Sequence, residues 1–321
     1  MQINNCDKKT TPIIIGGTGW LGSATLNLVR QCPKLSEPIF FGSGNAIRSK
    51  NGATIYPLAL FREVMATFSP ANKYIIFNFA YLTKDTAGNF SDENYKLASQ
   101  KINKNIASLI TLVMPNALLF ISSGAASMLE KGLSNSRDLL IYGKQKIDDE
   151  RFFSELCKTN HIKFLSPRVF NLGGPFINKL NAYALSNFIL QSLSSRRIVI
   201  ESDRPVYRSY CYVYDLLKVA ILEMTSSKDL GNLEVFEVGG KDRVELKDLA
   251  KIIAEETSLP KKNIMRQTLN KTLPADNYLA DNNVFEALLA KHAIPQTDLA
   301  QIVKETISFI QEHHSNQIRL R

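Results

Sequence analysis

The chain has 321 residues, of which 45% are hydrophobic, and its formal net charge at neutral pH is +9. This length and apolar content suffice for one large or two modest globular domains. The first dozen residues are polar and no apolar run approaches the roughly 18 residues that span a bilayer. We therefore expect no membrane partner and no secretory signal, and we expect the protein to be cytoplasmic.

Charge and cysteine usage narrow the choice of partners. The four cysteines, Cys6, Cys32, Cys157 and Cys211, lack the spacing of metal ligands, which favours reduced thiols and predicts no metal site. The basic residues are dispersed, and pairs such as Arg196-Arg197 are isolated, so we expect no nucleic-acid partner. A nucleotide-bearing small molecule fits a mildly basic cleft better.

A glycine-rich turn near the N-terminus organises the chain. Residues 13–15 are three isoleucines, which predict a buried strand, and apolar residues at helical spacing follow the turn. The first amides of a helix lack intrahelical partners and carry the positive end of its dipole, so a pyrophosphate fits there. A plain structural turn is the alternative. The dinucleotide interpretation assigns cofactor binding to Gly16, Gly19, Trp20, Leu21 and Gly22.

The end of the expected second strand, over residues 38–41, bears on the choice of cofactor. An acidic residue commonly meets the adenosine ribose of NAD at this place, and here the strand runs into Ser43 instead. Arg48 follows a few residues later and could accept a ribose 2′-phosphate, which favours NADP over NAD. That Arg48 is a solvated loop residue is equally open.

Strands and helices continue to alternate, which predicts a Rossmann-like, doubly wound parallel sheet of the α/β class. The fourth strand should bring Ala80 to the cofactor, and a polar loop is expected over residues 81–93. The other expected strands cover residues 53–60 and 118–124, and the expected helices cover residues 61–68 and 95–113.

Two hydroxyls and a tyrosine–lysine pair follow in the chain. Ser122 and Ser123 end a buried strand, where parallel sheets bind ligands, although such serines also simply turn the chain. Tyr142 and Lys146 lie four residues apart on a helix expected to open at Ile141, so they share one face. An ammonium beside a phenol lowers the pKa of the phenol toward a useful range.

Taken in this order, the glycine turn, the strand-end serine and the Tyr-x-x-x-Lys pair resemble the extended short-chain dehydrogenase/reductase family, in its nucleotide-sugar epimerase/dehydratase branch. The resemblance implies that Ser123, Tyr142 and Lys146 are catalytic, and that Tyr142 and Lys146 also contact the cofactor. Hydride would pass between a nicotinamide and a sugar carbon, while Tyr142 exchanges a proton with the sugar oxygen.

The resemblance continues in two later segments. Residues 167–175, PRVFNLGGP, are similar to the family's Arg-x-x-Asn-x-x-Gly-Pro segment, which implies that Asn171 binds near the diphosphate of the substrate. The catalytic motif implies that Ser123 contacts the substrate as well, at its reacting oxygen. Residues 207–216 are similar to its Arg-Asp-Phe-x-x-Val-x-Asp-Leu signature, which implies that Arg208 binds the nucleotide phosphates. Asp215 is expected to be a helix N-cap.

Four positions depart from the family pattern. Gly124-Ala125 replaces the Asp-Glu pair of the dehydratases, so we expect no dehydratase activity. Ser127 stands at the usual tyrosine, and Tyr81 replaces a small residue and is expected to narrow the pocket. In contrast to these departures, Asn103, on the helix before Ser123, is a candidate match to the asparagine that organises the family's proton relay.

The remaining chain is expected to complete a smaller C-terminal substrate-binding region. We predict a cofactor domain over residues 1–175, with later strands returning to it near 205–240, and a region of substrate binding and C-terminal helices over 176–321. The expected helices cover 182–193, 245–256 and 298–321, with His313-His314 as a solvated end, and strands cover 197–201 and 233–240.

These features predict an NAD(P)-dependent oxidoreductase acting on a nucleotide-linked sugar, in the first place a keto-sugar reductase using NADP. The alternatives are a nucleotide-sugar epimerase with a retained cofactor and a non-catalytic dinucleotide sensor. The resemblance also implies a homodimer formed through the helices that contain Ile106 and Phe152.

Overall fold

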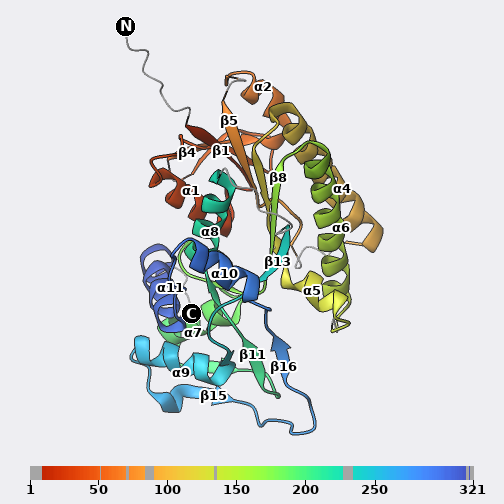
Figure 1. Ribbon diagram of the computed structural model, residues 1–321. Coiled ribbons are helices and arrows are strands. Elements are labelled where there is room, and N and C mark those ends of the chain that lie inside the picture. Colours follow the sequence, from red (N-terminus) through yellow and green to blue (C-terminus); the bar gives the residue numbers. More distant parts are fainter. Residues whose placement is uncertain are drawn as a thin grey trace. The chain divides into compact units, whose positions relative to one another are not determined.

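The protein divides into two compact units in the computed structural model, which describes residues 9–50, 52–69, 72–83, 90–133, 136–226, 234–315 and 318 (Figure 1). The first unit comprises Met1–Arg168 and Ala220–Phe236, and the second comprises Val169–Val219 and Glu237–Arg321. Cys6, part of the expected 81–93 loop and the end of the expected C-terminal helix lie outside the described residues.

The first unit is built on a mostly parallel sheet with the strand order β13, β8, β6, β5, β1, β2, β4, β3. β1 pairs with β2 on one side and with β5 on the other, and the antiparallel pair is β3 with β4. This order confirms the predicted Rossmann-like sheet. The strands are β1 Thr10–Ile15, β2 Ile39–Gly42, β3 Arg48–Lys50, β4 Ala53–Pro57, β5 Lys73–Asn78, β6 Ala117–Phe120, β8 Lys163–Val169 and β13 Val235–Val238.

Helices cover both faces of this sheet, with α1 opposite α4 and α6 (Figure 1). Ile13, Ile14 and Ile15 are all fully buried, as strands covered on both faces require. Ile13 and Ile15 join one core cluster with Ile106 of α4 and Phe153 of α6, whereas the side chain of Ile14 points to the other face. The helices are α1 Trp20–Arg30, α2 Phe61–Met65, α4 Asp92–Val113, α5 Gly124–Glu130 and α6 Arg137–Thr159.

Several local expectations in this unit were wrong, among them the loop over 81–93, because Ser91 caps α4 and the helix begins at Asp92. The strand expected to reach residue 60 ends at Pro57, because its partner β2 ends at Gly42, and a 3₁₀ turn, η1 Leu58–Leu60, follows. The strand expected over 118–124 ends at Phe120. A two-residue strand, β7 Ser122–Ser123, and the unexpected helix α5 follow it. The helix α6 begins at Arg137, one turn early, because the Ser136 hydroxyl caps it.

The second unit contains small sheets and helices. β9 Leu172–Gly173 pairs with β12 Cys211–Tyr212, β10 Ile198–Ile200 pairs with β15 Ile264–Arg266, and β11 Val206–Arg208 lies between β14 Val244–Glu245 and β16 Asp276–Tyr278. The helices are α7 Ala184–Ser194, α9 Leu246–Glu256, α10 Asn283–Lys291 and α11 Leu299–His313, with a 3₁₀ turn, η2 Lys261–Asn263. The helix α8 Val213–Thr225 begins in this unit, and its residues from Ala220 on belong to the first unit.

Asp215 is not the helix N-cap that its sequence position predicts. It lies inside the first turn of α8 and is buried, and its carboxylate accepts hydrogen bonds from the backbone N and the Oγ1 of Thr297. Thr297 precedes Asp298, which caps α11. The Asp215 carboxylate therefore binds a residue that is distant in sequence, and it holds the segment at which α11 begins. None of the helices in the described residues has the length and apolarity that crossing a membrane requires.

Candidate active site

Two glycines of the N-terminal turn are required by the fold itself. Gly16 has φ of +85°, and a Cβ there would lie 2.9 Å from the carbonyl of Phe79, which follows β5. A Cβ on Gly22 would lie 2.5 Å from the Cα of Gly17, so α1 packs directly on the turn. Ala80 lies beside the turn, since the same Gly16 Cβ would come within 3.1 Å of the Ala80 nitrogen.

Gly19 is different, because no neighbouring atom of the described residues would clash with a Cβ there. The nearest atom to a Cβ at Gly19 is the Gly16 oxygen at an ordinary 3.5 Å. Gly19 is the N-cap of α1, no side chain caps that end, and the first turn, which starts with Trp20 and Leu21, carries no acidic residue. The amides of this turn and the space at Gly19 fit the pyrophosphate of a dinucleotide.

Basic side chains flank the end of β2. Ser43 is exposed there, and Arg48 belongs to β3 rather than to a loop. The Arg48 guanidinium lies over Gly44, where a Cβ would come within 2.5 Å of its Nη2. Lys50, also on β3, donates from Nζ to the Thr18 oxygen of the glycine turn at 2.7 Å. Sequence reasoning missed Lys50, because only the β3–β4 hairpin brings it back to the turn.

Ser123 and Tyr142 are linked by close backbone packing. Ser123 caps α5, and its Oγ accepts from the Ala125 nitrogen at 3.2 Å. Gly143, the residue after Tyr142, packs on the same turn, since a Cβ there would lie 2.7 Å from the Ala125 oxygen. A glycine in the middle of a helix normally costs stability. Here it lets α6 approach the N-terminus of α5, a contact that the Tyr142-Gly143 dipeptide does not reveal in the sequence.

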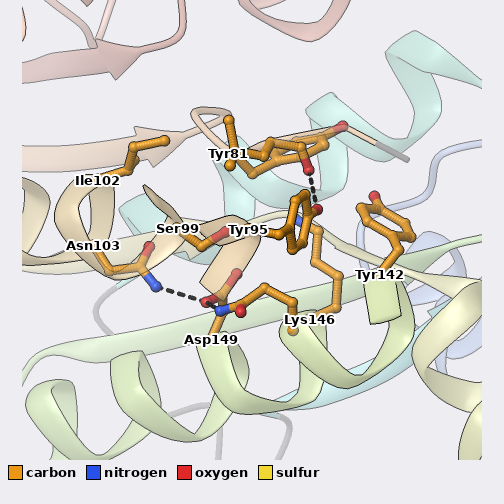
Figure 2. A pocket seen from close by; sticks show the side chains of 10 residues that line it. Tyr81, Tyr95, Ser99, Ile102, Asn103, Tyr142, Lys146 and Asp149 are labelled. Atoms are coloured by element: carbon orange, nitrogen blue, oxygen red, sulfur yellow. Dashed lines mark hydrogen bonds between the residues drawn. The ribbon is translucent and has the colours of Figure 1, made fainter. Parts of the chain in front are cut away.

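Lys146 is fully buried beside the rings of Tyr81, Phe120 and Tyr142. Figure 2 shows Lys146 with the two tyrosines. Its Nζ donates to the Ile121 oxygen at 2.9 Å and lies 3.5 Å from the ring centroid of Tyr81. The centroid of the Tyr142 ring is 5.9 Å away, and the Tyr81 and Tyr142 rings are 6.5 Å apart. Burial lowers the pKa of Lys146 from 10.5 to about 8, against the opposing charges of Asp149 and Glu150. The group is therefore still mostly an ammonium at neutral pH.

A small pocket lies beside Lys146, between α4 and α6 (Figure 2). Asp149 lines it and is only 4% exposed. One of its oxygens, Oδ1, accepts from Asn103 Nδ2 at 2.6 Å and from Gln145 Nε2 at 2.7 Å. Burial raises the pKa of Asp149, while Lys146 and the two amides hold it down. The lining residues are Tyr81, Leu82, Tyr95, Ser99, Ile102, Asn103, Tyr142, Gln145, Lys146 and Asp149.

The next carboxylate on α6 is bound quite differently. Glu150 is also 4% exposed, and its two oxygens accept from Nε and Nη2 of Arg168 at 2.8 and 2.6 Å. The Ser122 hydroxyl donates to Glu150 as well. Arg168 further binds Glu130 at the end of α5. This network joins β7, α5, α6 and β8, and it leaves Ser122 as a structural residue next to Ser123.

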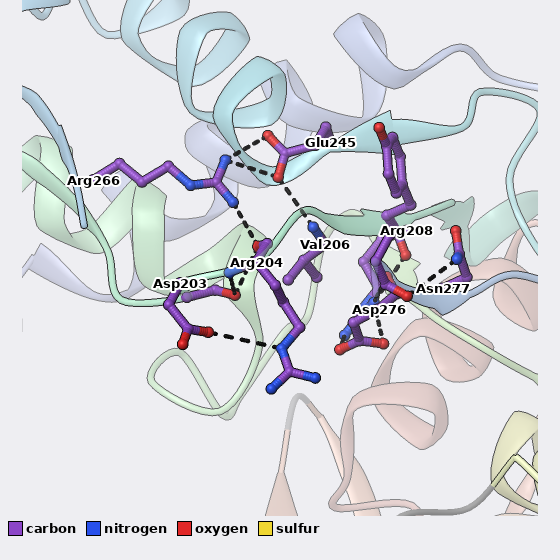
Figure 3. Close-up of polar contacts among 11 residues, drawn as sticks. Asp203, Arg204, Val206, Arg208, Glu245, Arg266, Asp276 and Asn277 are labelled. Carbon is purple, nitrogen blue, oxygen red and sulfur yellow. Dashed lines mark hydrogen bonds and ion pairs between the residues drawn. The ribbon is translucent and has the colours of Figure 1, made fainter. Parts of the chain in front are cut away.

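In the second unit, Arg208 is held by a carboxylate. Its Nη2 lies 2.9 Å from Oδ2 of Asp276, and its Nη1 contacts Oδ1 of the same group at 3.3 Å (Figure 3). The side chain of Arg208 is 21% exposed. Asn171 donates from Nδ2 to the Ser209 oxygen at 3.2 Å. Asn171 therefore contacts the residue that follows Arg208 in the chain. No sequence pattern predicted that Asp276 would bind Arg208.

A buried ion pair fixes the strand that carries Arg208. Arg266 on β15 binds both oxygens of Glu245 at 2.9 and 2.8 Å, and these side chains are 11% and 13% exposed (Figure 3). Glu245 also accepts from the Val206 nitrogen on β11 and caps α9. The position of β11 is therefore set independently of the Arg208–Asp276 contact.

Comparison with known proteins agrees with this fold. A UDP-glucose 4-epimerase of Mycoplasma genitalium is 24% identical over 278 residues, which cover 76% of this chain and 81% of that protein. A UDP-glucuronic acid decarboxylase of Arabidopsis thaliana is 26% identical over 110 residues, which span only 34% of this chain and 32% of the plant protein. The crystal structure of a Bacillus cereus UDP-glucuronic acid 4-epimerase with UDP-glucuronic acid and NAD aligns with a TM-score of 0.71 and 16% identity, over 94% of this chain and 99% of that one.

A family match covers most of the chain. The profile described as the NAD dependent epimerase/dehydratase family matches residues 13–239, which begin at β1 and end after β13. This range includes the glycine turn, Ser123, Tyr142 and Lys146. The chain therefore belongs to the NAD-dependent epimerase/dehydratase family.

Proposed function

We propose that the protein is an NAD(P)-dependent oxidoreductase that reduces a keto group on a nucleotide-linked sugar. The observation that carries this proposal is the buried ammonium of Lys146, one helical turn from Tyr142 and bonded to the backbone of the strand end before Ser123. A buried ammonium beside a phenol has few structural uses, and it favours the phenolate electrostatically.

Each residue has a distinct task in this reaction. The bound dinucleotide supplies or accepts the hydride. Tyr142 gives its phenolic proton to the sugar oxygen, and Lys146 stabilises the phenolate that remains. The Ser123 Oγ accepts a hydrogen bond from the Ala125 nitrogen, which leaves its own proton to donate to the same sugar oxygen. Asn171 and Arg208 are the proposed contacts to the nucleotide part of the substrate.

NADP is the proposed cofactor. The end of β2 carries Ser43 in place of an acidic residue, and the cations Arg48 and Lys50 flank it. A 2′-phosphate would gain from both charges, whereas the 2′-hydroxyl of NAD would find no carboxylate. The Arg48→Ala variant should weaken NADP binding and leave NAD binding unchanged in the same calorimetric titration.

A nucleotide-sugar epimerase is the second candidate, and the match to the Mycoplasma genitalium epimerase over 76% of the chain favours it. An epimerase would use the same Ser123, Tyr142 and Lys146, with a cofactor that stays bound and is regenerated. Dehydration fits poorly, because Gly124 and Ala125 open α5 where an acid and a base would be needed.

The transfer of deuterium from labelled NADPH separates these reactions. The full chain is incubated with NADPH deuterated at the nicotinamide C4 and a panel of UDP-, dTDP-, GDP- and CDP-linked keto-sugars. A reductase releases NADP and places one deuterium on a sugar carbon. An epimerase interconverts sugar nucleotides with no net NADP release. A sensor binds the cofactor without either product, and Tyr142→Phe should abolish turnover while retaining cofactor binding.

We further propose a cytoplasmic homodimer formed through α4 and α6. Leu97 of α4 is 56% exposed, and Leu140 and Phe152 of α6 are 42% and 41% exposed. Cys32, Cys157 and Cys211 are free thiols, which suits a reducing compartment. Sedimentation of the wild type and of Phe152→Glu tests the dimer, which the charged variant should dissociate. A wild-type monomer at micromolar concentration would refute it.

A further inference from the structure

Two neighbouring carboxylates on α6 have opposite electrostatic surroundings. The charge of Glu150 is matched by Arg168, which binds both of its oxygens. The hydrogen-bond partners of Asp149 are the neutral amides of Asn103 and Gln145. These amides support a negative charge without cancelling it. The field of Asp149 therefore remains available to the nearest buried cation.

That cation is Lys146, which lines the same pocket as Asp149 and lies three residues before it on the helix. Lys146 is 1% exposed and Asp149 is 4% exposed, so water screens their interaction little. The Lys146 amine donates a hydrogen bond to the Ile121 oxygen and lies over the rings of Tyr81 and Phe120. A buried amine in such surroundings loses its proton readily unless a negative charge is close.

We propose that Asp149 is a positioning residue that keeps Lys146 protonated beside Tyr142, and that Asn103 and Gln145 hold the Asp149 carboxylate in its ionised form. Asp149 touches neither substrate nor cofactor and acts through Lys146. The proposal rests on the assigned role of Lys146 in the proposed function. It extends that function by naming Asp149 as the negative charge that keeps the Lys146 amine protonated.

Among the residues that the structure describes, the ionisable groups around this pair come from three segments. Burial raises the pKa of Tyr95, and the charge of Asp149 raises it further, so Tyr95 stays neutral and donates to the Leu82 oxygen. Glu150 adds to the field at Lys146, with Arg168 opposing it. The groups are Tyr142, Lys146, Asp148 and Glu150 on α6, Tyr95 on α4 and Tyr81 after β5.

The test is a direct titration of Lys146 by NMR, using the full chain labelled with ¹³C at the lysine Cε and assigned by comparison with Lys146→Met. In the wild type the resonance should titrate near pH 8. In Asp149→Asn the midpoint should fall by about one pH unit or more, because the charge is lost while the acceptor oxygen is kept. Asp148→Asn, the same change one residue away on a partly exposed side chain, should leave the midpoint in place.

A second variant covers the case in which Asp149→Asn does not fold. Asn103→Ala removes one donor from Asp149, which should weaken its ionised form and lower the Lys146 midpoint by a smaller amount. An unchanged midpoint in the folded variants overturns the inference, whether or not the enzyme turns over. A shifted midpoint in a protein that transfers no hydride supports the inference and refutes the proposed function alone. If turnover is found, the alkaline limb of its pH profile should shift with the midpoint.

Discussion

Lys146 and Arg208 are both cations at candidate sites, and the two units hold them in contrasting ways. Lys146 is buried without a carboxylate contact among the described residues, and its ammonium is supported by a carbonyl and aromatic rings. Arg208 is partly exposed and bound by both oxygens of Asp276. A cation kept out of ion pairs remains available for chemistry, whereas a paired cation must first exchange its partner. Under the proposed function, Lys146 can therefore act without breaking an ion pair, whereas Arg208 must exchange Asp276 for the phosphate of a ligand.

Removing the Lys146 charge should produce the largest effect. Lys146→Met should lower turnover by about 10²–10⁴-fold, because the phenolate of Tyr142 loses its stabilising charge. Steady-state kinetics with NADPH and the substrate found in the panel measure this loss. The exposed neighbour Lys144 is the control, and Lys144→Met should keep full turnover. A Lys146→Met enzyme with more than a tenth of wild-type turnover would remove Lys146 from the mechanism.

The same buried amine should make stability depend on pH. The pKa of Lys146 is lowered from 10.5 to about 8 in the fold, so between these values the unfolded chain binds the extra proton. Stability attributable to Lys146 therefore rises as pH increases through this range, by up to about 3 kcal/mol in total. Urea unfolding of the wild type and Lys146→Met at pH 7.5 and pH 10 measures the difference. Parallel pH dependence in the two proteins would argue against a buried ammonium.

Disturbing the helix that carries the pair should have a smaller effect on turnover. A Cβ on Gly143 would meet the Ala125 oxygen at 2.7 Å, so Gly143→Ala must move α6 away from α5. A displacement of this kind can cost about 10²-fold in turnover through misorientation. Lys144→Ala, on the exposed side of the same turn, is the control. The expected signature is a low kcat with cofactor affinity close to normal, and a normal kcat would show that the close packing is not needed.

The smallest effect is expected in the second unit. Asp276→Asn frees Arg208 from an ion pair whose carboxylate is 45% exposed, and such pairs contribute about 0–1 kcal/mol. Nucleotide-sugar affinity should rise by up to about fivefold, as measured by calorimetry. Asp248→Asn removes an exposed ion pair with Lys251 and should leave affinity unchanged. Weaker binding by Asp276→Asn would mean that Asp276 contacts the ligand itself.

The elements that repeat a local pattern could be predicted from the sequence. The three isoleucines of β1, the glycine turn and the alternation of strands and helices each follow from nearest neighbours in the chain. Their paired order in the sheet follows from the right-handed crossover that such units share. Ser123, Tyr142 and Lys146 could be singled out as candidates for the same reason, since a strand end and a helical spacing are local features.

What the sequence could not indicate depends on contacts between distant segments. Asp149 is one of several acidic residues on α6, and only the packing of α4 brings Asn103 to it. The sequence position of Asp215 is typical of a helix N-cap, but its carboxylate accepts a hydrogen bond from Thr297 instead. Asp276 reaches Arg208 because β16 pairs with β11, and neither short strand has a marked pattern of its own. Asp149 and Asp276 are also the residues that set the charge around Lys146 and Arg208, respectively.

The central claim is that the glycine turn binds a dinucleotide that serves the Tyr142–Lys146 pair. Its most direct test is a calorimetric titration of the wild type and of Gly19→Ala with NADPH, NADP, NADH and NAD. We predict one site per chain in the wild type, a preference for the phosphorylated cofactor, and binding weakened about tenfold or more in Gly19→Ala, because the added methyl group occupies space needed by the pyrophosphate. No binding of any dinucleotide to the wild type would contradict the account.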